Sequence, residues 1–199
     1  MPTESYKERE LIEIPLGIRE SYIQAISAIS PYDEAEQRDI ETTLLWLKAS
    51  EHLNKPHNME EHLGVFAIVL SQDREHTFLL NHRKAKLWLP PGGHVDLGQR
   101  LHECALMEVE EELGMKEPKL LTEVPVFHTR THTQGMNAGH IDVTSWLLIE
   151  GDPESTYQIQ AKEASQSGWY NIKELLRTGE LSNLHRGFKK IFERGLLRD

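Results

Sequence analysis

The chain has 199 residues, of which 38% are hydrophobic and 27% charged, a composition typical of one globular domain with or without an extension. Its net charge of −10 argues against non-specific binding to a nucleic acid polymer or an anionic membrane, because both favour a basic surface. Cys104 is the only cysteine, so no intrachain disulfide can form. We find neither a signal segment nor an apolar run long enough to span a bilayer, and therefore expect a cytoplasmic protein.

The N-terminal part is expected to be helical from Leu16 to about Leu53. Ser30 and Pro31 together resemble a helix start, with serine as the N-cap and proline at the first helical position. One face carries the apolar residues Ile40, Leu44 and Leu47. We expect residues 1–58 to form a helical extension packed on the rest of the chain; a helical arm, a lid and a homodimer contact remain alternatives.

The middle of the chain is rich in expected strands. Residues 64–70 form a continuous apolar run, as in a central strand, and residues 77–80 form its return strand after a polar turn. Lys86 to Leu89 lead into a Pro-Pro-Gly-Gly turn, where glycine lets the backbone approach a ligand closely. Further strands are expected at 120–128 and 141–149, with a polar loop at 131–139, and helices at 172–176 and 184–197.

Three glutamates mark the expected helix that follows this turn. Glu108, Glu111 and Glu112 share one face at helical spacing, whereas the apolar residues Val109 and Leu113 lie on the other side. Like charges at this spacing repel one another and need a compensating role. Carboxylate oxygens that converge on one point suit Mg²⁺ or Mn²⁺. The alternative is an ordinary solvated acidic face.

The surrounding segment, GHVDLGQRLHECALMEVEEELGM from Gly93 to Met115, resembles the Nudix box. The positions that match the pattern are Gly93, Glu108, Val109, Glu111, Glu112, Gly114 and Met115. The resemblance implies an α+β fold, a Nudix-like α/β/α sandwich around a mixed sheet, which we place at residues 59–199. It also implies metal-dependent hydrolysis of a nucleoside diphosphate linked to another moiety, and hence a small phosphorylated substrate.

Two positions depart from the box. Gln99 stands where the pattern has glutamate, and Met107 where it has arginine. Losing an acid and a base together leaves the local charge balance unchanged, so our hypothesis is a compensated pair that retains catalysis. The alternative is a domain that binds or senses a nucleotide without hydrolysing it. A Nudix-type isomerase is a weaker alternative, because its expected cysteine and glutamate pair is not evident.

The resemblance also implies a carboxylate in a later loop that completes the metal site or serves as the base. Glu163, six residues before Trp169, has the required spacing, and Glu150 is the less favoured substitute. A divalent cation at the glutamates would lower the pKa of a bound water, and Glu108 or Glu163 would accept its proton.

Other residues near the box are candidates for substrate contacts. The backbone at Gly92 and Gly93 is expected to fix the geometry of the helix start. Arg83 and Lys86 could contact phosphates, although a solvated basic edge is slightly favoured for them.

The histidines are treated separately. His128, His132 and His140 lack the spacing of a zinc site, so we expect polar loop residues, one of which could reach the substrate. His140 and Asp142 form an H-x-D element that is similar to one found in Nudix relatives.

Overall fold

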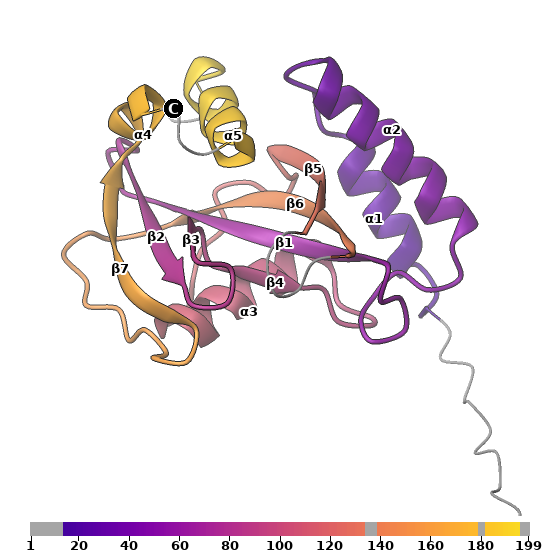
Figure 1. Ribbon diagram of the computed structural model, residues 1–199, viewed down its shortest axis with the longest axis horizontal. Coiled ribbons are helices and arrows are strands. Elements are labelled where there is room, and N and C mark those ends of the chain that lie inside the picture. Colours follow the sequence, from indigo (N-terminus) through magenta and orange to yellow (C-terminus); the bar gives the residue numbers. More distant parts are fainter. Residues whose placement is uncertain (1–13, 134–138, 179–181, 196–199) are drawn as a thin grey trace, which may run out of the picture.

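The computed structural model describes residues 14–133, 139–178 and 182–195. Within these ranges the chain forms five helices and one mixed seven-stranded sheet (Figure 1). The helices are α1 (Ile18–Ser27), α2 (Glu34–Ala49), α3 (Leu101–Leu113), α4 (Ile172–Thr178) and α5 (Ser182–Glu193). The strands are β1 (Glu61–Leu70), β2 (His76–His82), β3 (Leu87–Leu89), β4 (Gly92–His94), β5 (Phe127–His132), β6 (Ile141–Glu150) and β7 (Ala164–Asn171).

Strand β1 is the centre of the sheet. It pairs in parallel with β6 along its whole length, and the strand order is β3-β2-β1-β6-β5. The short strand β4 pairs antiparallel with β1, and β7 pairs antiparallel with β2. The expected central strand is thus confirmed, and its continuous apolar run reflects burial on both faces.

Helices cover both faces of the sheet. On one face, Cys104, Ala105 and Val109 of α3 pack in one cluster with Leu63 and Val65 of β1. On the other face, α5 packs on β1 and β6 through Leu184, Phe188 and Ile191. In Figure 1, α3 lies below the sheet and α5 above it. The predicted α/β/α sandwich around a mixed sheet is confirmed.

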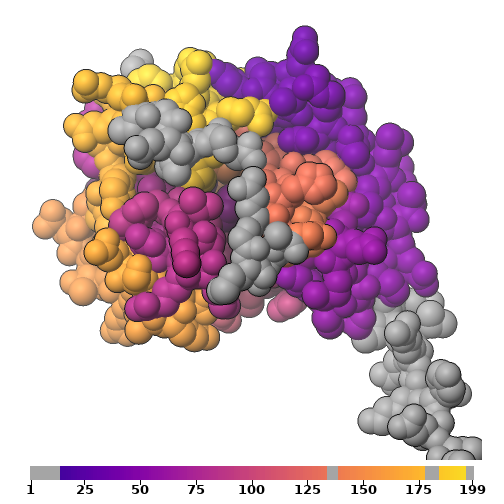
Figure 2. All heavy atoms as spheres, viewed as in Figure 1, coloured from indigo at the N-terminus to yellow at the C-terminus, as the bar shows by residue number. Residues whose placement is uncertain are grey.

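The predicted N-terminal helices are confirmed as α1 and α2, which lie at one end of the sheet. Tyr22, Ile26 and Leu47 are buried in the same cluster as the apolar face of α3. In the space-filling view the yellow C-terminal helix α5 lies beside the indigo N-terminal helices at the top of the molecule (Figure 2).

The predicted start of the second helix was wrong. Helix α2 begins at Glu34, with Asp33 as its N-cap, and the Asp33 carboxylate accepts a hydrogen bond from the Glu36 N–H at 2.8 Å. The carboxylate satisfies an N–H at the helix end, which is the usual role of an aspartate N-cap. Ser30 and Pro31 instead lie in the irregular segment between α1 and α2, where their carbonyl oxygens accept hydrogen bonds from Arg194.

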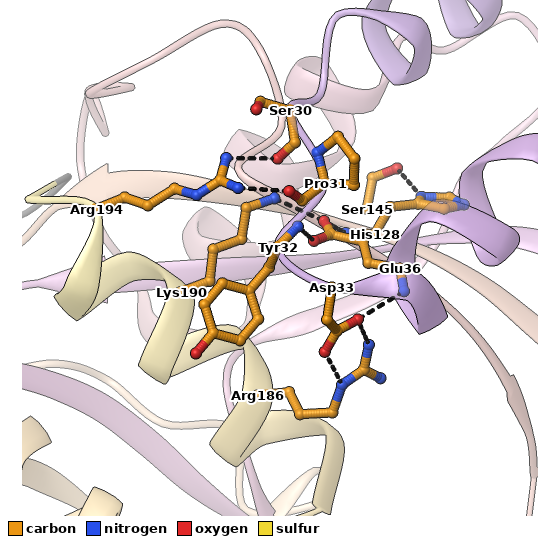
Figure 3. Close-up of polar contacts among 10 residues, drawn as sticks. All are labelled: Ser30, Pro31, Tyr32, Asp33, Glu36, His128, Ser145, Arg186, Lys190 and Arg194. Atoms are coloured by element: carbon orange, nitrogen blue, oxygen red, sulfur yellow. Dashed lines mark hydrogen bonds and ion pairs between the residues drawn. The ribbon is translucent and has the colours of Figure 1, made fainter.

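A buried polar network joins α2, β5 and α5 (Figure 3). The Glu36 carboxylate accepts hydrogen bonds from Lys190 Nζ at 2.7 Å and from the His128 backbone N–H at 3.1 Å. Both partners of the ion pair are almost inaccessible, with 0% of Glu36 and 1% of Lys190 exposed. Burial, together with the positive charge of Lys190, lowers the pKa of His128 to about 3, so this side chain is neutral.

The strand expected at 120–128 was partly wrong. Strand β5 begins only at Phe127, and before it Leu120 makes a single bridge to Ile149. Pro125 has no N–H to donate, which favours irregular backbone there. The expected loop at 131–139 is shortened by the extension of β5 to His132, and residues 134–138 lie outside the described part of the chain.

Three other elements differ from expectation. The two glycines predicted in a turn belong to strand β4. Strand β7 was not predicted, because its sequence, ASQSGWYN, carries mostly polar residues on an exposed edge. The expected last helix is α5, which begins at Ser182 and ends at Glu193, and Leu197 lies outside the described residues.

None of the described helices is long and apolar enough to cross a membrane.

We predict that Lys190→Met lowers the free energy of unfolding by about 3–5 kcal/mol, because it strands a buried Glu36 carboxylate. The double variant Glu36→Gln with Lys190→Met should recover part of this loss. Urea unfolding measures both. Arg38→Ala is the matched control, because Arg38 forms an exposed ion pair with Glu34 and should change stability little. A loss in Lys190→Met no larger than in this control would contradict the prediction.

Candidate metal centre

Helix α3 is bounded by local features of the box. The Glu103 carboxylate accepts a hydrogen bond from the Arg100 N–H at 2.8 Å, which satisfies one free donor at the helix start. At the other end Gly114 adopts a left-handed conformation with φ of 65°, which favours glycine. Both ends of α3 are therefore defined by local interactions, which fix the positions of its glutamates along the helix.

Two of the three glutamates face strand β4 rather than solvent. Glu112 is 7% exposed, and its carboxylate accepts a hydrogen bond from the Gly92 N–H at 3.1 Å. Glu108 packs on Gly93, where an added Cβ would lie 2.1 Å from Glu108 Oε1. Glu111 is exposed beside them. The ordinary solvated acidic face considered for this helix therefore does not describe Glu108 and Glu112.

The electrostatic surroundings of these carboxylates are strongly unfavourable to further negative charge. Burial, with the charges of Glu111, Asp96 and Glu163, raises the pKa of Glu108 to about 7. Burial also raises the pKa of Glu112 to about 7; the charge of Glu108 adds to this effect and the hydrogen bond from Gly92 opposes it. The principal charges acting on the pair are negative, so a cation would stabilise the ionised forms.

The segment that carries Glu163 is tied to the end of α3. The Gln160 side-chain amide donates to the Glu111 carbonyl oxygen at 2.5 Å, and the Gln158 N–H donates to the Leu113 carbonyl oxygen at 2.8 Å. Glu163 is placed just before β7, near enough to act on the pKa of both Glu108 and Glu112. Its carboxylate also lies 3.9 Å from His82 Nε2. Glu150, the less favoured candidate, lies at the far end of β6, beside a hollow lined by Gly114 and Met115.

The two basic candidates have different surroundings. Arg83 holds the Glu163 segment: its Nε–H donates to the Ala161 carbonyl oxygen at 2.7 Å, and its backbone N–H donates to the Glu163 carbonyl oxygen at 2.8 Å. Lys86 is exposed in the turn before β3, with a positive φ of 54°. Arg83 thus supports the position of a candidate ligand through its neighbours, a contact that sequence spacing did not indicate.

The two residues that depart from the box lie against each other. The Gln99 side-chain amide donates to Met107 Sδ at 3.3 Å, and Gln99 Oε1 accepts a hydrogen bond from the Asp96 N–H at 3.2 Å. The neutral residues therefore occupy contacting positions, as the hypothesis of a compensated pair requires.

The histidines were only partly understood from the sequence. His128, expected in or near a polar loop, is buried, with its ring between Thr43 Oγ1 at 2.9 Å and Ser145 Oγ at 3.0 Å. His132 is exposed on β5. His140 lies with His62, His94 and Asp142 in a group that the spacing of these residues in the sequence does not indicate.

The family model described as the NUDIX domain matches residues 60–193. The chain belongs to the Nudix family. This confirms the resemblance based on the box from Gly93 to Met115. Helices α1 and α2 precede the matched residues.

Two curated relatives share part of the chain. The Xenopus laevis protein named m7GpppN-mRNA hydrolase NUDT17 is 43% identical over 60 residues, which are 27% of this chain and 20% of the relative. The Homo sapiens protein of the same name is 41% identical over 63 residues, 29% of this chain and 19% of the relative. The chain therefore spans about a fifth of the length of these curated relatives.

Solved structures of Nudix hydrolases share the fold. A C. elegans Ap4A hydrolase binary complex superposes with a TM-score of 0.54 at 17% identity, over 67% of this chain and 96% of that chain. The E. coli dihydroneopterin triphosphate pyrophosphohydrolase superposes with a TM-score of 0.55 at 13% identity, over 69% of this chain and 95% of that chain.

We predict that Gly93→Ala displaces the Glu108 carboxylate and weakens Mg²⁺ or Mn²⁺ binding about 10- to 100-fold, with little loss of stability. The reason is that the added Cβ meets only the end of a flexible side chain. In Gly92→Ala the Cβ would lie 2.2 Å from the Val65 carbonyl oxygen, so this variant should lose about 1–3 kcal/mol of stability.

Calorimetric titration with Mn²⁺ and thermal unfolding separate these two effects. Gly168→Ala on β7 is the matched control, because its added Cβ would lie 3.8 Å from Tyr170, an ordinary contact. Wild-type Mn²⁺ affinity in Gly93→Ala would contradict the proposed packing of Glu108.

Proposed function

We propose that this protein is a metal-dependent Nudix pyrophosphohydrolase that cleaves the phosphoanhydride of a nucleoside diphosphate linked to another moiety. The observation that carries the proposal is the pair Glu108 and Glu112, packed against the β4 glycines and acted on mainly by other carboxylates. Such an arrangement is costly without a cation and suits one that binds oxygen ligands.

The residues that would hold Mg²⁺ or Mn²⁺ are Glu108, Glu111, Glu112 and Glu163. All four are carboxylates, the donor type that these hard cations prefer. When bound, the cation supplies positive charge to the diphosphate and lowers the pKa of a water at the site.

The protein residues supply position and proton transfer. The Gly92 N–H fixes one oxygen of Glu112, and the contact with Gly93 limits where Glu108 can turn. Glu108 or Glu163 accepts the proton of the attacking water; Glu163 has the histidine side chain of His82 beside it. Arg83 maintains the segment of Glu163, and Lys86, exposed beside β3, is free to meet a substrate phosphate.

The substrate class is a small phosphorylated molecule. The name of the NUDT17 relatives refers to the m7GpppN cap of mRNA, so a capped RNA end belongs among the substrates to be tested despite the net charge of −10. A cation at the carboxylates would reduce the repulsion between this acidic chain and a polyphosphate. We assign the activity to residues 59–199 and a supporting role to the helices within residues 1–58.

We predict that Glu112→Gln abolishes Mg²⁺-dependent turnover while leaving the fold intact. The amide oxygen of glutamine can still accept the Gly92 N–H hydrogen bond, but the negative charge is lost. Product release is measured with and without Mg²⁺ over capped dinucleotides, dinucleoside polyphosphates, nucleoside triphosphates, nucleotide sugars and ADP-ribose, with circular dichroism as the check on folding.

Glu110→Gln is the matched control, because Glu110 is an exposed glutamate on the same helix. Wild-type rates in Glu112→Gln would remove the proposed site. Normal Mn²⁺ binding by the wild type without turnover of any substrate would favour the alternative, a domain that senses a nucleotide.

The contact between Gln99 and Met107 motivates a test of the compensated pair against the alternative of a nucleotide-sensing domain. We predict that Gln99→Glu and Met107→Arg together raise turnover more than Met107→Arg alone, because only the double variant restores an ion pair. The measurement is kcat for the two single variants and the double variant, each compared with the wild type. Equal effects of the single and double changes would contradict the compensated pair.

A further inference from the structure

We propose a second metal site, for Zn²⁺ or a similar borderline transition metal, formed by His62, His94, His140 and Asp142. One potential ligand atom from each residue lies within 4.8 Å of all the others. The residues come from β1, β4, the start of β6 and the position just before it. Three imidazoles and one carboxylate suit Zn²⁺ better than Mg²⁺, which prefers oxygen ligands.

The distances within the group fit a four-ligand site. From Asp142 Oδ1, the Nε2 atoms lie at 3.3 Å for His62, 3.7 Å for His94 and 3.1 Å for His140. Ligands at about 2.0–2.1 Å from a tetrahedral zinc ion are separated from one another by about 3.3 Å. The three separations from Asp142 Oδ1 are close to this value, and all four ligand atoms lie within 4.8 Å of one another, so the group would bind the ion by drawing the histidine nitrogens closer together.

Two buried polar atoms in the group face each other without a well-formed hydrogen bond. His62 is 0% exposed, and its Nε2 faces Asp142 Oδ1 at 3.3 Å without the geometry of a hydrogen bond. The other ring nitrogen of His62, Nδ1, lies 3.0 Å from the Asn58 carbonyl oxygen, which fixes Nδ1 as the donor. In the neutral ring the lone pair of Nε2 then points toward a carboxylate oxygen, and a cation between the two atoms would satisfy both.

The surrounding contacts orient the other rings. The His140 ring stacks on that of His62 with centroids 4.7 Å apart, and its Nδ1 lies 3.1 Å from Thr133 Oγ1. This leaves His140 Nε2 directed toward Asp142. In metal sites, the ring nitrogen of a histidine ligand that does not bind the metal usually forms a hydrogen bond with the protein, as His140 Nδ1 does with Thr133.

This site is separate from the Glu108 and Glu112 centre. Side chains alternate along a strand, so His94 projects from the face of β4 opposite to that on which Gly93 meets Glu108. His62 and Asp142 are partners in the parallel register of β1 and β6. A bound ion would thus join three strands at one end of the sheet and fix β4 next to the glycines of the catalytic centre.

One cation competes with the proposed ion. Lys55 Nζ lies 3.4 Å from His94 Nε2 and must turn away when this nitrogen binds metal. Lys55 precedes β1 and has a flexible side chain, so this movement is feasible. The structure therefore predicts that Lys55→Met binds Zn²⁺ more tightly than the wild type.

The test uses the untagged full chain, dialysed against micromolar Zn²⁺ and then against metal-free buffer, with zinc measured by mass spectrometry. We expect about one zinc per chain, falling below about a tenth in His94→Gln and in His140→Gln, because each removes one of four ligands. Added Zn²⁺ should raise the Tm of the wild type and not that of these variants. The His94 side chain is 43% exposed, so its replacement should leave the fold intact, which circular dichroism checks.

Two controls separate this proposal from the proposed function. His132→Gln removes an exposed histidine at the same end of the sheet, and Glu112→Gln removes a ligand of the other centre; both should retain zinc. When Co²⁺ replaces Zn²⁺, the wild type should show the visible absorption of a tetrahedral site. His94→Gln and His140→Gln should not show it. A wild type that retains no zinc, or His94→Gln and His140→Gln variants that retain as much as the wild type, would overturn the proposal whatever the hydrolytic activity.

Discussion

The close packing of two glutamates of α3 on two glycines of β4 determines the structure of the candidate centre. A side chain at Gly93 would occupy the place of the Glu108 carboxylate, and one at Gly92 would collide with β1. The two glycines thus allow the glutamate carboxylates of α3 to pack directly against β4, which is in turn paired with the central strand β1. Burial and the charge of Glu108 raise the pKa of Glu112 to about 7, so its ionised form is less stable there than in water when no cation is present.

The same packing explains how much could be predicted from the sequence. The spacing of Glu108, Glu111 and Glu112 places them on one helical face, because helix periodicity depends only on local geometry. Their distances from Gly93 and Gly114 then indicated the box. The central strand was equally predictable, since residues 64–70 are continuously apolar and such a run is typical of a strand buried on both faces.

Features that depend on contacts between distant segments could not be predicted in this way. His62, His94 and Asp142 are far apart in the sequence and meet because β1 pairs with both β4 and β6. Strand β7 has a polar sequence and is recognised only by its pairing with β2. The start of α2 was misplaced because Asp33 competes with Ser30 as the N-cap, and the bidentate contact of Arg186 with Asp33 comes from α5.

The N-terminal helices also bear on the unusual box. The Tyr22 hydroxyl of α1 donates to the Gln99 carbonyl oxygen at 2.7 Å, while the Gln99 side chain contacts both Asp96 and Met107. Helix α2 in turn is joined to α5 through the buried pair Glu36 and Lys190. The loop before α3 is therefore held by a helix outside the matched family residues as well as by its own side chains. An ion pair within the box would be one restraint among several, so replacing it with two neutral residues in contact is compatible with an ordered loop and an intact set of carboxylates.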